Sequence, residues 1–318
     1  MTLHENTVKS RCHMNPEETL IKQLDTREYK ARVVSIQRLR DLRKMIDDFN
    51  DQGLLSKKLY DMYFTDFLSS PPEDSPDAQS LIVVAKKDPP SRFTFHHNKK
   101  TIHTVVPPTY LHGREKIDQT CTLLTDLLKP HGFRVVKVNV PNKLLGVCSG
   151  LAEYGKNNIA YVEGLGSFHR LTAFYSDLPC DDNQWRQPVM MEQCMECDKC
   201  MRSCPTGAIR TDRFLLNTER CITFWNEHPP DVDFPEWLKP AWHNSLIGCM
   251  ICQKVCPANH DLQDWLEPGA DFSEEETNIL LNGLPIDEIP QTMKDKLEES
   301  DLIGIVEILP RNLRVLLK

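Results

Sequence analysis

Apolar side chains recur every three or four residues over two stretches of the chain. Over residues 28–50 they stand at Val33, Ile36, Leu39, Leu42, Met45, Ile46 and Phe49. Over residues 114–129 they stand at Ile117, Cys121, Leu124, Leu127 and Leu128. This spacing places the apolar positions on one face of a helix, so it predicts an amphipathic helix in each stretch.

Shorter apolar runs predict strands. SLIVVAKKD, within residues 77–88, and FRVVKVNV, from Phe133, have the composition of strands, and RFTFHHNKKTIHTVV predicts a hairpin with its turn near Asn98. Helices with a sheet indicate an α+β or α/β domain over residues 1–187. A cysteine-rich module follows over 188–260. Residues 261–318 are expected to form an acidic helical segment that packs on the core.

Composition and charge narrow the class of protein. The 318 residues include 12 cysteines and carry a net charge of −8. The acidity is local, because residues 260–318 hold 14 Asp and Glu against 5 Lys and Arg. No basic stripe of the kind that binds nucleic acid stands out, so tRNA is not expected as a partner. The N-terminus lacks the apolar core of a secretory signal, and no apolar run could span a membrane; both favour a cytoplasmic protein.

Seven cysteines fall in two unequal runs. The first run has the spacing C-x2-C-x2-C-x3-C-P and consists of Cys194, Cys197, Cys200 and Cys204. In the bacterial ferredoxin pattern, three such thiolates hold one [4Fe–4S] cluster and the fourth crosses to the other cluster. The second run has only three members, Cys249, Cys252 and Cys256. Cys221 is the single cysteine between the runs, and it would supply the eighth ligand.

The crossing rule assigns these eight thiolates to two clusters. Cluster one takes Cys194, Cys197, Cys200 and Cys256. Cluster two takes Cys204, Cys221, Cys249 and Cys252. Structural zinc is the alternative, although zinc sites typically use paired C-x2-C knuckles rather than a four-cysteine run. Two adjacent clusters form a short path for electrons, and the domain before them is expected to hold what they reduce.

The cysteine segments and their surroundings resemble a known family. CMECDKCMRSCPTGAI, RCITFW and IGCMICQKVCPAN are similar to the double-cluster module of epoxyqueuosine reductases and, more distantly, of reductive dehalogenases. SGLAEYGKNNIAYVEGLGSFHRLTAFYSDLP is similar to the segment that precedes the clusters in that family. ARVVSIQRLRDL and LPRNLRVLL also resemble family members, so the similarity covers most of the chain.

The resemblance implies a fold and a second cofactor. It implies a nitroreductase-like α/β fold for the N-terminal domain, followed by a bacterial-ferredoxin-like double-cluster module. It also implies a base-off cobalamin between that domain and cluster one, with two loops lining the corrinoid pocket. Carried over to this sequence, the loops are Gly155, Lys156 and Asn157, and Gly166, Ser167 and Phe168. Tight turns are the alternative use of the loop glycines.

The sequence departs from the family at its proton donor. Epoxyqueuosine reductases carry an acid in an Asp-x-x-Pro context, and Val138 stands at that position here. A valine cannot transfer a proton, so another residue would be needed. Tyr154 and Tyr161, which flank the loops, are the candidate catalytic residues, with Tyr175 and His169 as further candidates. Packing or hydrogen bonding is the alternative role for each of them.

Three functions fit these features. The first is an oxygen-sensitive iron–sulfur reductase resembling epoxyqueuosine reductase, which passes electrons through two clusters to a base-off cobalamin and reduces an unknown substrate. The alternative is an electron-transfer protein that reduces the corrinoid of a partner protein, with the acidic segment docking on a basic surface. The third is a tRNA epoxyqueuosine reductase with a displaced proton donor. A low-potential donor such as ferredoxin or flavodoxin is the expected source of electrons.

Overall fold

A four-stranded antiparallel sheet is the centre of the larger part of the molecule. The computed structural model describes residues 15–318 except 66, 68–69, 72–74 and 181–183. The strand order is β1-β2-β8-β5, and every pairing in this sheet is antiparallel. The strands are β1 (Tyr29–Ser35), β2 (Ser80–Lys87), β8 (His169–Ser176) and β5 (Val135–Lys137).

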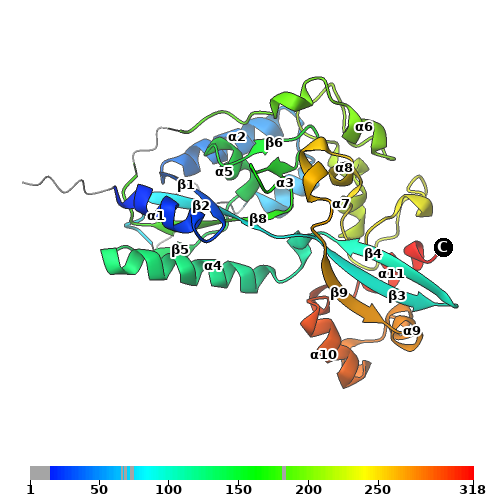
Figure 1. Cartoon of the computed structure of the whole chain (residues 1–318). Coiled ribbons are helices and arrows are strands. Elements are labelled where there is room, and N and C mark those ends of the chain that lie inside the picture. The colour runs from blue at the N-terminus through cyan, green and yellow to red at the C-terminus, as the bar shows by residue number, and fades with distance from the viewer. Residues whose placement is uncertain (1–14, 66, 68–69, 72–74, 181–183) are drawn as a thin grey trace, which may run out of the picture.

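Helices cover both faces of this sheet (Figure 1). On one face lie α1 (Pro16–Asp25) and α4 (Gly113–Leu128), and on the other lie α2 (Arg38–Asp51) and α5 (Asn142–Cys148). Along β2, Leu81 and Val83 pack with α2 and α5, whereas Ile82 and Val84 pack with α1 and α4. Side chains alternate along a strand, so the uninterrupted apolar run of β2 reflects a strand that is buried on both faces.

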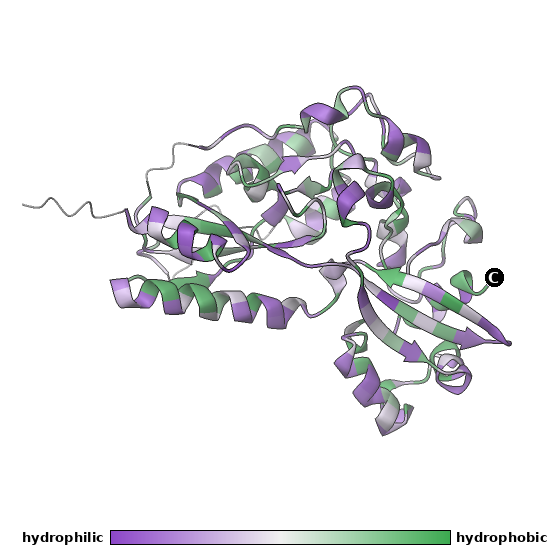
Figure 2. Cartoon of the chain, viewed as in Figure 1, coloured by the Kyte–Doolittle hydropathy of each residue, from purple (hydrophilic) through white to green (hydrophobic). Residues whose placement is uncertain are grey.

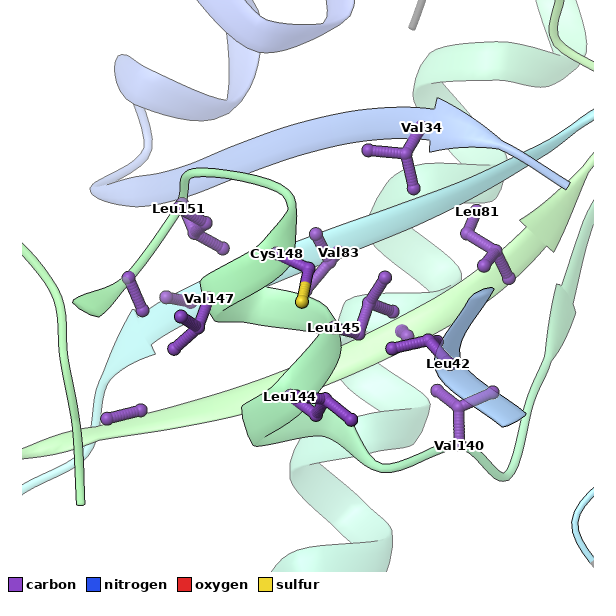
Figure 3. Close-up of a cluster of buried hydrophobic side chains, with 14 of the residues drawn as sticks. Val34, Leu42, Leu81, Val83, Val140, Leu144, Leu145, Val147, Cys148 and Leu151 are labelled. Carbon is purple, nitrogen blue, oxygen red and sulfur yellow. The ribbon is translucent and has the colours of Figure 1, made fainter. Parts of the chain in front are cut away.

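The core between the sheet, α2 and α5 contains a cysteine (Figure 3). Cys148 is fully buried, and its sulfur lies among Leu145, Val83 and Leu42 in this view. Its Sγ lies 3.8 Å from Sδ of Met45. Burial raises the pKa of the Cys148 thiol to about 12, so the group stays protonated. This cysteine behaves as a small apolar core residue.

A second sheet combines parts of the chain that are far apart in sequence. Its order is β4-β3-β9, formed by β3 (Ser91–His97), β4 (Lys100–Val106) and β9 (Glu267–Phe272). The β3–β4 hairpin turns at Asn98 and Lys99, which have φ angles of 49° and 62°. This confirms the hairpin predicted from the sequence, because two successive positive φ angles are typical of a tight hairpin turn. β9 pairs parallel to β3.

Three helices after the cysteine-rich region cover the second sheet. They are α9 (Glu274–Asn282), α10 (Gln291–Glu299) and α11 (Leu309–Leu316). The rings of Phe95 and Phe272 stack at a centroid distance of 4.9 Å, which links β3 to β9. The hydrophilic colour dominates α10 in Figure 2, as expected for a helix with one face in solvent. The acidic segment thus packs mainly against the hairpin.

Short helices build the cysteine-rich region. They are α6 (Lys199–Ser203), α7 (Ile222–Asn226) and α8 (Ile251–Lys254), and α6 packs against α8. Short α3 (Lys57–Tyr63) and the two-residue strands β6 (Glu153–Tyr154) and β7 (Ala160–Tyr161) lie on the same side of the molecule (Figure 1). Within the part of the chain that the structure describes, no helix has both the length and the apolar character needed to cross a bilayer.

The architecture confirms the mixed helix-and-strand class and corrects one helix. The pattern predicts a single helix over residues 28–50, but the structure forms β1 first and begins α2 only at Arg38. Ala31 and Val33 pack on the face of the sheet that α1 and α4 cover, and Val34 packs on the face that α2 and α5 cover. A short strand with apolar residues on both faces imitates helical spacing when a helix follows directly. The domain boundaries and the nitroreductase-like description stay predictions.

Candidate metal centre

Four thiols line a cavity where the α/β domain meets the cysteine-rich region. The thiols belong to Cys194, Cys197, Cys200 and Cys256. The loop Gly155–Asn157 contributes to the wall of the same cavity. These four cysteines are the set that the crossing rule predicts for cluster one. Packing of α6 against α8 brings the two cysteine runs together.

The remaining four cysteines of the two runs gather around α7 and α8. Cys221 lies within electrostatic reach of Cys249 and Cys204, and Cys252 lies within reach of Cys249 and Cys221. Burial raises the pKa of the Cys221 thiol to about 11, so in the protein without metal this thiol holds its proton. Binding of iron would have to release that proton.

The arrangement of the thiols fits a cluster. Among the described residues, no three His, Cys, Asp or Glu side chains converge closely enough to hold one metal ion. The four thiols of the cavity surround a space instead. Zinc draws its sulfurs to within about 2.3 Å of one point, whereas a cube of iron and sulfide needs thiolates spread around it. The lining of the cavity therefore fits a cluster.

Two polar side chains support the cysteine loops. Lys156 Nζ donates a hydrogen bond to the carbonyl oxygen of Cys197 at 2.7 Å. Asn244 Nδ2 donates to Sγ of Cys249 at 3.2 Å, while its Oδ1 accepts from the amide of Met250 at 3.1 Å. Donors to a ligating sulfur fix its orientation and tune the metal. Sequence spacing did not reveal Asn244, because it lies before the cysteine run and belongs to no motif.

The Gly-Ser-Phe loop docks directly on the cysteine-rich region. The amide of Ser167 donates to Asn259 Oδ1 at 2.9 Å, and Asn259 Nδ2 donates to Ser167 Oγ at 2.7 Å. Asn259 is fully buried and follows Cys256 by one helical turn. Gly166 has a φ of 53°, and a Cβ on it would lie 2.3 Å from Asn259 Oδ1. The glycine is therefore required for this close contact.

The Gly-Lys-Asn loop is also held by protein contacts. Asn157 Nδ2 donates to the hydroxyl of Tyr161 at 3.0 Å, and a Cβ on Gly155 would lie 2.5 Å from Asn157 Oδ1. Phe168 is buried at the end of the neighbouring loop. These contacts explain both glycines by close packing. The predicted role of the two loops in a corrinoid pocket is carried forward as a proposal.

The two candidate catalytic tyrosines lie in packed positions. Tyr154 is 7% exposed, and its ring meets Phe214 edge-on at 5.8 Å. Tyr161 is 5% exposed and accepts the hydrogen bond from Asn157. Burial raises the pKa of both phenols far above their ordinary value, which makes them poor acids. Their positions favour the packing role over proton donation.

The two further candidates are no better placed. Tyr175 is 4% exposed and belongs to the core beside α2 and α5. Burial lowers the pKa of His169 to about 4, so its imidazole is neutral at neutral pH. Val138 packs against the same core as Tyr175. The proton donor therefore has to be sought elsewhere.

Comparison with known proteins agrees with this geometry. A family described as "4Fe-4S double cluster binding domain" matches residues 193–259. The epoxyqueuosine reductase of Salmonella typhimurium is 36% identical over 161 residues, which is 50% of this chain and 38% of the relative. The epoxyqueuosine reductase of Francisella cf. novicida is 29% identical over 161 residues, which is 48% of this chain and 43% of the relative. The chain resembles epoxyqueuosine reductases.

The fold extends the resemblance beyond the cysteines. A solved epoxyqueuosine reductase from Bacillus subtilis superimposes with a TM-score of 0.67 at 20% identity, covering 94% of this chain and 80% of that one. In sequence, the matched regions span less than half of the two curated relatives. The chain thus carries a double [4Fe–4S] domain on an epoxyqueuosine reductase-like fold.

Lys156 offers a test of cluster one in this epoxyqueuosine reductase-like chain. Its cation lines the cavity, and a nearby positive charge favours the reduced, more negative cluster. Lys156→Met is expected to lower the midpoint potential of cluster one by something on the order of tens of mV. The measurement is an EPR-monitored redox titration. Lys199→Met is the matched control, because Lys199 is exposed and its charge is screened by solvent. Equal shifts in both variants would contradict this placement of Lys156.

Proposed function

We propose that this chain is an iron–sulfur reductase of the epoxyqueuosine reductase type. Electrons would pass through two [4Fe–4S] clusters to a cobalamin that serves the reduction of an organic substrate. The observation that carries the proposal is the cavity in which cysteines of both runs meet a loop of the α/β domain. Cluster one would be held by Cys194, Cys197, Cys200 and Cys256. Cluster two would be held by Cys204, Cys221, Cys249 and Cys252.

The two carried-over loops fit a corrinoid through their backbone and surface. The side-chain groups of Lys156, Asn157 and Ser167 already have protein partners, so they are not free donors. The loops join the α/β domain to the cysteine cavity, which would keep a cofactor bound beside them close to cluster one. A bound corrinoid would supply a low-valent cobalt for reduction of the substrate. The nitroreductase-like description of the domain belongs to the same proposal.

Epoxyqueuosine in tRNA becomes the first candidate substrate. The curated relatives are named epoxyqueuosine reductases, and a solved structure with the same fold, at a TM-score of 0.67 and 21% identity, holds an epoxyqueuosine-modified tRNA stem loop. The expectation against tRNA is therefore not supported. It rested on the lack of a basic stripe in the sequence, and the acidic residues that dominate the net charge lie largely on the segment around α9 and α10.

The surface of the cysteine-rich region also suits a nucleic acid. It carries basic side chains placed over half-buried aromatic rings, and such rings and guanidinium groups stack well on unpaired bases. The pairs are Arg220 with Trp237 and Lys239 with Trp242. This observation favours the tRNA substrate over the electron-carrier alternative.

The test begins with protein whose clusters are reconstituted without oxygen. Cob(II)alamin is added, and the EPR spectrum is recorded. Loss of the axial-nitrogen splitting is expected on base-off binding. The loaded, reduced protein is then incubated with tRNA that contains epoxyqueuosine, and loss of the epoxide is measured by mass spectrometry of the nucleosides. An unchanged free-cobalamin spectrum beside reducible clusters would overturn the proposal and favour electron transfer to a partner's corrinoid.

A further inference from the structure

A carboxylate and a phenol meet where the hairpin, the α/β domain and the cysteine-rich region converge. Glu227 follows α7 directly, and Tyr110 ends a short 3-10 helix after β4. The hydroxyl of Tyr110 donates a short hydrogen bond to Glu227 Oε1. The ring of Tyr110 packs on Gly248, where a Cβ would lie 2.8 Å from Cε2. The phenol is thus fixed between the two parts of the molecule.

Charged and polar groups from other elements face this pair. Lys143, at the start of α5, interacts electrostatically with Glu227 and Cys221. Tyr63, at the end of α3, is 60% exposed and also interacts electrostatically with Glu227. Nε2 of His228 accepts a hydrogen bond from Lys58 Nζ at 2.8 Å. Residues from α3, α5, α7 and the 3-10 helix therefore converge here.

Glu227 and Lys143 are reached by solvent, and the protein around them still affects their pKa values. Glu227 and Lys143 are exposed side chains. Nevertheless, desolvation by the surrounding protein raises the pKa of Glu227 and lowers the pKa of Lys143. Solvent therefore reaches both side chains, while the surrounding protein still disfavours their charged forms.

We propose that Glu227 is the proton donor of this reductase and that Tyr110 and Lys143 position it. The inference rests on the proposed function. It would replace the acid that is missing at Val138, because Lys143, which interacts with Glu227, begins α5 five residues after Val138. Tyr110 holds one carboxyl oxygen of Glu227, which fixes the orientation of the carboxyl group.

The chemistry balances with this assignment. Removing the oxygen of an epoxide breaks both of its carbon–oxygen bonds, forms a carbon–carbon double bond and releases water. The reaction consumes two electrons and two protons. A low-potential donor of the ferredoxin or flavodoxin type supplies the electrons one at a time through the clusters. Glu227 gives its proton to the departing oxygen, regains one from solvent and gives it again, so that the oxygen leaves as water.

The direction of the pKa shift agrees with this role. Desolvation raises the pKa of Glu227, while the hydrogen bond from Tyr110 and the charge of Lys143 act in the opposite direction. An acid with a raised pKa keeps its proton closer to neutral pH. Activity should therefore persist at low pH and fall as pH rises through that pKa. Tyr110→Phe removes the hydrogen bond that lowers the pKa of Glu227. The fall in activity should therefore move to higher pH.

The test measures protonation and turnover separately. In the reconstituted holoprotein, infrared spectra over a pH series should show the carbonyl stretch of a protonated carboxylic acid that is absent from Glu227→Gln. The band should disappear at a pH above that of an ordinary glutamate. In single turnovers with epoxyqueuosine tRNA, Glu227→Gln should lose about 10²- to 10⁴-fold in rate, and Glu227→Asp should recover part of it.

Glu236→Gln is the matched control, because Glu236 is exposed and belongs to the same segment. It should retain the band and the rate. A Glu227 band that titrates like an ordinary glutamate, or a rate unchanged in Glu227→Gln, would overturn the assignment. If the wild-type protein does not turn over, the proposed substrate fails, while the infrared titration still decides whether Glu227 is a protonated acid.

Discussion

Replacing Cys256 with serine is expected to remove cluster one and to leave cluster two in place. In sequence Cys256 closes the second run, but in the structure it lines the cavity with three cysteines of the first run. Iron should fall from about eight to about four atoms per chain. Cys204→Ser should do the reverse, because Cys204 lies near Cys249 and Cys221.

EPR spectra of the reduced proteins decide between crossed and run-by-run ligation. With crossed ligation, Cys256→Ser and Cys194→Ser leave the same residual spectrum, and Cys204→Ser and Cys249→Ser leave the other one. If Cys256→Ser instead matched Cys249→Ser, each run would hold its own cluster and the assignment would be wrong. Cys121→Ser is the control and should keep the full iron content, since Cys121 lies on α4 and packs against the core between α4 and the sheet.

Gly166→Ala is expected to loosen the contact between the α/β domain and the cysteine-rich region. The added Cβ would lie 2.3 Å from Asn259 Oδ1 and 2.6 Å from Leu262 Cδ1, and the backbone of Gly166 has a φ of 53°. Overpacking and left-handed strain together should destabilise the folded protein by about 2 to 4 kcal/mol. Anaerobic urea unfolding of the holoprotein measures this loss.

Gly164→Ala separates backbone strain from packing. Gly164 lies in the same turn with a φ of 75°, but its Cβ would have no neighbour within 4 Å. Its substitution should therefore cost only about 1 kcal/mol, the strain alone. Gly166→Ala should also release iron to a chelator faster, because Asn259 follows the ligand Cys256 closely. Equal destabilisation by both variants would show that the contact with Asn259 contributes nothing.

The sequence predicts elements whose periodicity is long or whose turn is specific. α4 falls within one residue of the predicted stretch at each end, and the hairpin turns at Asn98 as expected. The sequence predicts a helix where β1 forms, because the apolar residues of β1 pack on both faces of the sheet and so imitate helical spacing. β9 carries Pro268 and Gly269, which argue against a strand, and only pairing with β3 makes it one.

The candidate site shows the same division between local and non-local information. The cysteine set of the cavity follows from spacing and the crossing rule, since cluster ligation imposes a fixed pattern. The tyrosines next to the loops attracted a catalytic prediction, yet their rings are buried. Glu227 and Tyr110 are separated by more than a hundred positions, and no local pattern connects them. The one available signal was a carboxylate that ends the apolar stretch after Cys221.

Because β3 pairs with β9, the second sheet can be completed only late in synthesis on the ribosome. On β3, the apolar side chains of Phe93 and Phe95 pack against Phe272 and α9–α11. These elements leave the ribosome after both cysteine runs. Until then the hairpin presents an open strand edge, which is prone to pairing with other chains. The nascent chain can therefore meet iron before its last sheet closes, and a cell that assembles clusters slowly leaves that edge exposed for longer.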